Sequence, residues 1–143
     1  TFCLRRPMSS SEDSTDKPLL VTRNKNTGNL GEEIACKFYL DKGCEIIARN
    51  VYVSRIGEID IIARHTTDVH DIFVFAEVKT RNGSAHGHGY EAVSYHKKQR
   101  MRRCAQIWIQ DYMGYESKFS WRLDVVSINL AMRPPQVRLF KNV

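Results

Sequence analysis

Two acids and a lysine stand near the ends of two strand-like runs in the middle of the chain. Residues 57–63 contain Asp60, and residues 72–79 end with Glu77 and Lys79. Successive side chains of a strand point to opposite faces, so Glu77 and Lys79 are predicted to share one face. The second run is otherwise apolar on both faces, which is typical of a buried strand. Charged groups in such a place need a compensating partner.

Carboxylates of this kind suit a divalent cation. Asp60 and Glu77 offer the hard oxygen ligands that Mg²⁺ or Mn²⁺ binds, and Lys79 would then face a phosphate or position a water. Glu58 lies two residues before Asp60, which predicts a shared face and makes it a candidate additional acid. The alternative is an ordinary cross-strand ion pair of Lys79 with Asp60 or Glu58 on a solvated sheet face.

The strands that position these residues follow from the same periodicity. Residues 57–79 predict an antiparallel hairpin with a polar turn at 65–71, and residues 45–53 predict a strand before it. A fourth strand is expected at 121–128, where Asp124 is expected to pair with Arg122 or a neighbouring strand. A short edge strand is expected at 136–141.

Two amphipathic helices complete the pattern. Apolar residues recur every three or four positions from Asn29 onward, and Gly43 is placed to end that helix. A second helix is expected over 91–112, with a buried stripe of Met101, Cys104, Ala105, Trp108 and Tyr112. The order helix, three strands, helix, strand, with a short final edge strand, predicts an α/β fold in which helices flank a mixed sheet.

Glu32 has two interpretations. It falls in the predicted first turn of the first helix, where the helix dipole favours acids, and its spacing from Asn29 is that of a capping box. The other interpretation, a place among the acids of the site, comes only from the resemblance to a known family that is described below.

Five cations gather within seven residues of the second helix, with no acid between them. Because such a run cannot form ion pairs one turn apart, an external anion would relieve its repulsion, and we expect a phosphate backbone there. The alternative is a solvated face. The predicted nucleic-acid-binding residues are these five, Lys97, Lys98, Arg100, Arg102 and Arg103, together with Arg81 at the end of the hairpin.

Composition sets the remaining limits. The chain has 143 residues, a net charge of +6 and 42% hydrophobic residues, which predicts one soluble globular domain that suits a polyanionic partner. No apolar run approaches a membrane span. The four cysteines lack metal-site spacing, so reduced thiols in a cytoplasmic protein are expected. Residues 1–27 are predicted to be a flexible tail before a domain at 28–143, and the glycine-rich residues 80–89, with His86 and His88, a mobile loop.

Five ordered motifs resemble the YraN-like family of small predicted endonucleases. That family is similar to archaeal Holliday-junction resolvases and belongs to the restriction-endonuclease-like superfamily with a PD-(D/E)xK site. The resemblance runs from about residue 28 to the end of the chain. The motifs are NLGEEIA (29–35), ARN (48–50), GEIDIIA (57–63), FAEVKTR (75–81) and RLDVV (122–126).

The resemblance implies roles for four residues. Asp60 and Glu77 correspond to the metal ligands, Lys79 to the catalytic lysine, and Glu32 to the first-helix acid that completes the site. It implies a restriction-endonuclease-like fold and a Mg²⁺- or Mn²⁺-dependent nuclease acting on DNA, including branched DNA or repair intermediates. A homodimer is implied by the resolvases, because two strands need symmetric cuts. The alternative is a non-catalytic nucleic-acid-binding module of a DNA repair or recombination complex.

Overall fold

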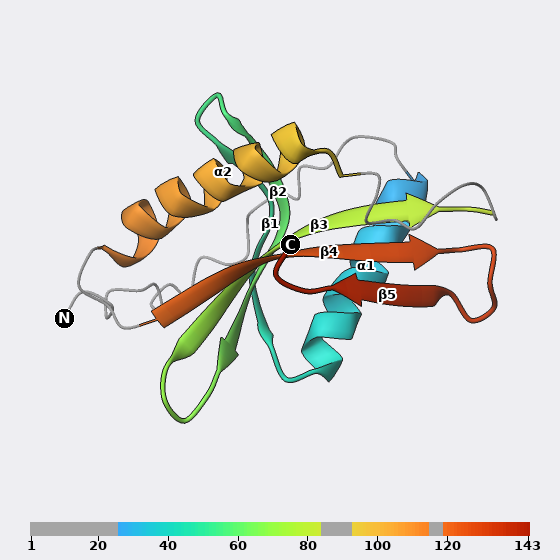
Figure 1. The fold of residues 1–143 in the computed structure, drawn as a ribbon. Coiled ribbons are helices and arrows are strands. Elements are labelled where there is room, and N and C mark those ends of the chain that lie inside the picture. Colours follow the sequence, from blue (N-terminus) through green and yellow to red (C-terminus); the bar gives the residue numbers. More distant parts are fainter. Residues whose placement is uncertain (1–25, 84–92, 115–118) are drawn as a thin grey trace, which may run out of the picture.

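The computed structural model describes residues 26–83, 93–114 and 119–143, and within these ranges the chain forms two helices and five strands (Figure 1). Their order is that predicted from the sequence, an α/β arrangement with a short last strand. The tail prediction falls almost wholly outside the described residues, as do His86 and His88. The elements are α1 (Asn26–Asp41), β1 (Glu45–Val53), β2 (Gly57–Thr66), β3 (Asp71–Arg81), α2 (Tyr95–Met113), β4 (Phe119–Asn129) and β5 (Gln136–Phe140).

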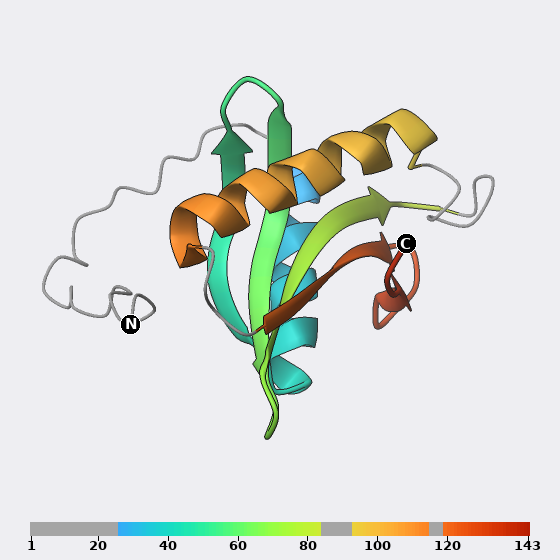
Figure 2. The ribbon, with the colours of Figure 1, turned by 60° about the vertical axis from the view of Figure 1, so that its left-hand side comes forward.

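The five strands form one mixed sheet in the order β1-β2-β3-β4-β5. Neighbours that are joined by short turns are antiparallel, whereas β3 and β4 are parallel because α2 lies in the crossover between them. Strand β3 is therefore the middle strand and is covered on both faces, which explains its apolar run. The sheet twists strongly along its length (Figure 2).

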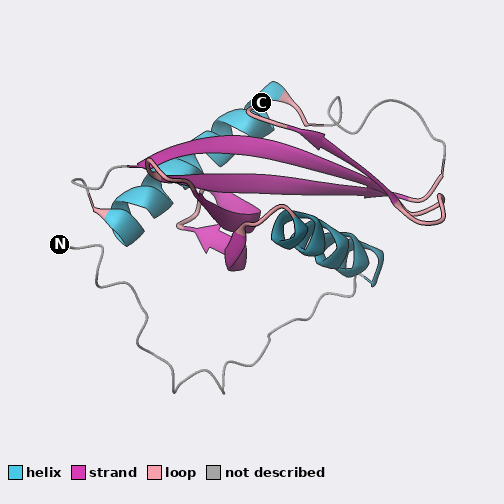
Figure 3. Ribbon diagram, turned by 90° about the horizontal axis from the view of Figure 1, so that it is seen from below, coloured by secondary structure: helices cyan, strands magenta, loops and turns pink. Residues whose placement is uncertain are grey.

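The two helices lie on opposite faces of the sheet (Figure 3). Each covers one hydrophobic cluster, and the side chains of β3 alternate between the clusters as predicted. Phe73 and Phe75 pack with α2, whereas Val74 and Ala76 pack with α1. The face of Glu77 and Lys79 is therefore the α2 face, which places α2 beside these two charges.

Both helices begin at residues that differ from the sequence prediction. Helix α1 begins at Asn26, three residues before the predicted start, so Glu32 lies in its second turn. The predicted capping box from Asn29 to Glu32 is therefore wrong, because both residues lie inside the helix. Gly43 ends the helix with a φ of 87°, as predicted. Helix α2 begins at Tyr95 rather than at residue 91, after the N-cap Ser94.

The apolar stripe of α2 is close to the predicted one but is rotated slightly. Its buried members are Met101, Cys104, Ala105, Ile109 and Met113. The predicted members Trp108 and Tyr112 are half-buried at its edge, where their rings stack with centroids 4.3 Å apart. The described cysteines Cys36, Cys44 and Cys104 are buried free thiols. Neither helix of the described residues is long and apolar enough to cross a membrane.

Asp124 is a fully buried charge that joins three parts of the fold. Arg122 Nε donates to its Oδ1 at 2.9 Å, which confirms the predicted pairing of these two residues. The Tyr39 hydroxyl of α1 donates to its Oδ2 at 2.9 Å, and the backbone N–H of Asn142 donates to its Oδ1 at 3.1 Å. Because each partner satisfies a buried charge, the carboxylate fixes α1 and the chain end against β4.

Helix α1 also approaches the end of β3 very closely. A Cβ added at Gly31 would lie 1.9 Å from Thr80 Oγ1 and 3.0 Å from Thr80 Cβ. Only a residue without a side chain fits between the helix and the strand at this point. The glycine therefore sets the distance at which Glu32, the next residue, stands from β3.

We expect Gly31→Ala to lower the free energy of unfolding by about 1–2 kcal/mol, because overpacking outweighs the helix propensity that alanine gains. Chemical denaturation measures the loss. Thr80→Ala removes two of the three close atoms, so adding it to Gly31→Ala should restore part of the stability. The matched control is Gly57→Ala, where the added Cβ would meet Cys104 Sγ at an ordinary 3.4 Å. A Gly31→Ala protein as stable as the parent would contradict this packing.

Candidate active site

Asp60 stands where β2 and β3 stop pairing. The ladder between these strands runs from Thr66 back to Ile61, opposite Ala76, and does not continue to Asp60. The Asp60 side chain instead accepts a hydrogen bond from the backbone N–H of Val78, with a distance of 2.8 Å to Oδ2. The carboxylate thus ties the separating strands together and lies next to Glu77.

Regular strand alternation is interrupted at the same place. Ile59 packs in the cluster beneath α2, whereas Ile61 packs in the cluster beneath α1, although the two residues are two apart. The argument that put Glu58 and Asp60 on one face therefore does not apply, since it assumes an unbroken strand. Glu58 is half-buried opposite Tyr52 of β1, and its side chain makes no hydrogen bond or ion pair with the described residues.

Glu77 is the most deeply placed acid of this group, with a side chain that is 6% exposed. Two ammonium groups contact its Oε1, that of Lys79 at 3.3 Å and that of Lys97 at 3.2 Å. The alternative of a cross-strand pair between Lys79 and Asp60 or Glu58 is wrong, because Lys79 pairs along its own strand. The Lys97 contact was not predicted, because residues 77 and 97 are brought together only by the packing of α2.

The acids act on one another electrostatically. Burial, followed by the negative charge of Glu77, raises the pKa of Asp60 to about 7, and Glu32 adds to the rise. The Val78 N–H and the charge of Lys97 oppose it. A carboxylate shifted in this way gains from any additional positive charge, which is the condition expected of a cation ligand.

Glu32 reaches this group from α1 and is held by β1. Asn50 Nδ2 donates to its Oε2 at 3.0 Å, and Arg49 Nη2 lies 3.8 Å from the same oxygen. Asn50 has a φ of 50°, in the left-handed region that asparagine tolerates better than most residues. Glu32 is therefore a neighbour of the site and not a helix cap.

The five cations of α2 do not form one face. Lys97 turns toward Glu77, Lys98 and Arg102 are half-buried, and only Arg100 and Arg103 are exposed. The prediction that the five cations form one binding surface rested on their closeness in sequence. A helix turns 100° per residue, so five cations in seven residues must point in different directions around it. Arg81 is half-buried at the end of β3, opposite Asn129.

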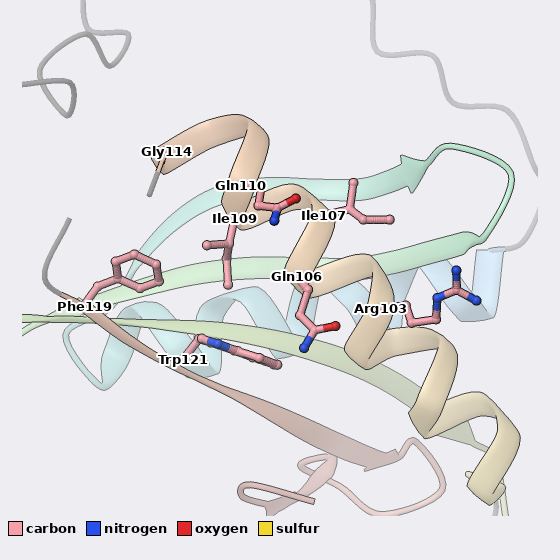
Figure 4. A pocket seen from close by; sticks show the side chains of 8 residues that line it. All are labelled: Arg103, Gln106, Ile107, Ile109, Gln110, Gly114, Phe119 and Trp121. Carbon is pink, nitrogen blue, oxygen red and sulfur yellow. The ribbon is translucent and has the colours of Figure 1, made fainter. Parts of the chain in front are cut away.

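A separate open cavity of about 620 Å³ lies beside the C-terminal half of α2 (Figure 4). It does not include Asp60, Glu77 or either of their lysines. Its walls come from α2 and the start of β4, whereas the acids lie further along the sheet. The lining residues are Arg103, Gln106, Ile107, Ile109, Gln110, Gly114, Phe119 and Trp121.

The carboxylate oxygens of Asp60 and Glu77 suit a hard cation that keeps some of its bound water molecules. Among the residues that the structure describes, no three His, Cys, Asp or Glu side chains converge closely enough to hold a metal ion. A cation at Asp60 and Glu77 would need backbone oxygens or water for its other ligands. Mg²⁺ is bound in this way, through one or two carboxylates and several waters.

The fold and these residues define a class. A five-stranded mixed sheet with a helix on each face is compatible with the restriction-endonuclease-like fold. The order of the elements agrees with that class.

The chain belongs to the family described as "Uncharacterised protein family UPF0102", whose model matches residues 31–128. The likeness to the YraN-like family, a family of small predicted endonucleases, is thereby confirmed. A UPF0102 protein of Nocardia farcinica is 44% identical over 101 residues, which cover 71% of this chain and 74% of the relative. One of Alkaliphilus oremlandii is 36% identical over 119 residues, which cover 83% and 97%.

The raised pKa of Asp60 predicts a pH-dependent stability. In the unfolded chain this carboxyl ionises near 3.8, whereas in the folded chain it keeps its proton to about 7. The folded state binds more protons between these values, so Asp60 lowers stability as the pH rises from about 4 to about 7. In metal-free buffer we expect Asp60→Asn to be more stable than the parent by on the order of 2–4 kcal/mol at pH 8, and nearly equal to it at pH 4.

Denaturant unfolding at a series of pH values measures this difference. Asparagine retains an oxygen that can accept the Val78 N–H, so the comparison isolates the charge. Asp41→Asn is the matched control, because Asp41 is exposed and pairs with the exposed Lys37 of α1, away from the acid group. A pH-independent gap between Asp60→Asn and the parent would contradict the pKa assignment.

Proposed function

We propose that the protein is a Mg²⁺- or Mn²⁺-dependent nuclease that hydrolyses phosphodiester bonds in DNA, branched DNA included. The observation that carries this proposal is a buried carboxylate, Glu77, that contacts two half-buried lysines and raises the pKa of the neighbouring half-buried Asp60. The carboxylates suit a cation, and the ammonium groups suit the phosphate that the cation would accompany. Membership of a family of predicted endonucleases supports the same activity.

Each residue has a distinct part in this reaction. Asp60 and Glu77 would hold the cation, which when bound lowers the pKa of water and polarises the phosphate. Asp60 is oriented by the Val78 N–H, and Glu77 by its two lysines. The side chain of Lys79 is 34% exposed, so its charge can offset the negative charge that develops on the phosphate oxygens.

A nucleic-acid-binding module without catalysis is the second candidate. It is favoured by the absence of a third acid within metal-holding distance among the described residues, and by the exposed Arg100 and Arg103 on α2. Such a module would bind phosphate with these cations and leave Asp60 and Glu77 with a structural role. Replacement of Lys79 distinguishes the nuclease from the binding module, because only a nuclease would lose cleavage activity.

Calorimetry tests the cation site. We expect Mn²⁺ to bind the parent and to bind Asp60→Asn/Glu77→Gln at least tenfold more weakly, since both charged ligands are replaced by neutral amides. The matched control is Glu33→Gln/Asp41→Asn, which removes two exposed acids outside the group. Equal affinity of the site variant and the parent would mean that the cation binds elsewhere.

Lys79→Met tests the catalytic role of the lysine. We expect this variant to cleave DNA on the order of 10²-fold more slowly at saturating substrate, because the ammonium matters most as the transition state gains charge. Its DNA affinity should stay within a few-fold of the parent. Turnover on linear, flapped and four-way DNA measures the first quantity, and fluorescence anisotropy in EDTA measures the second.

The control for Lys79→Met is Lys37→Met, which removes an equal charge from the exposed pair with Asp41 on α1. It should leave both quantities unchanged. If the parent cleaves none of these substrates with either cation, the binding module replaces the nuclease. If Lys79→Met cleaves at the parental rate, Lys79 only neutralises Glu77.

A further inference from the structure

The first turn of α2 brings an unexpected charge to the candidate active site. Lys97 is the third residue of the helix, and its backbone N–H donates to the Oγ of the N-cap Ser94 at 3.2 Å. Its ammonium nevertheless lies 3.2 Å from Oε1 of Glu77. The helix start therefore fixes the backbone of Lys97, and the side chain reaches down to the sheet.

Two ammonium groups share one carboxylate oxygen. Lys79 lies 3.3 Å from Oε1 of Glu77 and Lys97 lies 3.2 Å from it, and the charge of Lys97 also favours the ionised form of Asp60. The two nitrogens are at most 6.5 Å apart, the sum of their distances to Oε1, and they repel each other. A lysine in the first turn of a helix is also opposed by the helix dipole. The repulsion between the two lysines and the unfavourable helix dipole both lower stability, and proteins accept such losses mainly at functional sites.

The layering of the charges indicates what the second lysine is for. Glu77 is 6% exposed, whereas the side chains of Lys79 and Lys97 are 34% and 32% exposed. The ammonium groups thus lie over the acid and face solvent from two sides, one from β3 and one from α2. Two neighbouring ammonium groups of this kind suit one phosphate group better than two separate ones.

We propose that Lys97 is a second substrate-contacting lysine of the active site, which with Lys79 binds the phosphate group that is cleaved. This rests on the proposed nuclease function and assigns Lys97 to the reacting phosphate, apart from the exposed cations of α2. In the free protein Lys97 shares Glu77 with Lys79. When the carboxylate binds a cation, the ammonium of Lys97 is repelled from that cation and turns to the phosphate.

Two measurements on Lys97→Met test this assignment, with the full chain and Lys37→Met as control. The first needs no catalysis. Because an ammonium beside Glu77 opposes a cation there, Mn²⁺ titrated calorimetrically should bind Lys97→Met about threefold or more tightly than the parent, and Lys37→Met unchanged. Equal Mn²⁺ affinity in Lys97→Met and the parent would overturn the proposal.

The second measurement separates the phosphate contact from general DNA binding. At saturating DNA, cleavage by Lys97→Met should fall on the order of 10²-fold, with DNA affinity in EDTA within a few-fold of the parent. Lys97→Arg, which keeps the charge, should recover part of the rate. Weaker DNA binding with an unchanged saturated rate would overturn the proposal and return Lys97 to the general phosphate-binding cations.

Folding does not obscure these outcomes. Glu77 keeps Lys79 as a partner in Lys97→Met, and a thermal melt checks that the variant is folded. If the parent cleaves no DNA, the proposed nuclease function fails while the Mn²⁺ titration still decides whether Lys97 belongs to the cation site. The two failures are therefore distinguishable.

Discussion

The burial of two like charges side by side is the constraint around which this site is built. Asp60 and Glu77 come from adjacent strands, and burial together with the negative charge of Glu77 raises the pKa of Asp60. The protein offsets this with one backbone N–H on Asp60 and two ammonium groups on Glu77. Among the described residues, Asp60 receives only the single N–H, and its pKa is raised to about 7.

This arrangement depends on the end of regular pairing between β2 and β3. Were the ladder to continue past Ile61, the Val78 N–H would be taken by a backbone carbonyl, and Asp60 would lose its partner. The change of face between Ile59 and Ile61 allows one side chain of β2 to enter the gap. The site is thus placed by a defect in the sheet, which the sheet tolerates because the carboxylate takes over the missing hydrogen bond.

The rest of the fold holds the helices against this point from both sides. Asp124 fixes α1 through Tyr39, and Gly31 lets the same helix approach Thr80, so that Glu32 stands near the acids. On the other face, Met101 and Cys104 fix α2 on the sheet, and its first turn carries Lys97 to Glu77. Each helix therefore contributes one charged side chain to the site through packing at a distance from it.

The sequence alone predicted the order of the elements, the buried strand β3 and, as one of two alternatives, the pairing of Asp124 with Arg122, and it selected Asp60, Glu77 and Lys79 as candidates. These follow from periodicity and residue type, which neighbours along the chain carry. Only the tertiary structure decided that Lys97 meets Glu77 and that Asn50 holds Glu32. Residues 77 and 97 meet, as do residues 32 and 50, because each helix packs at a particular position along the strands of the sheet. That geometry is set by the packing of whole faces, so no local spacing contains it.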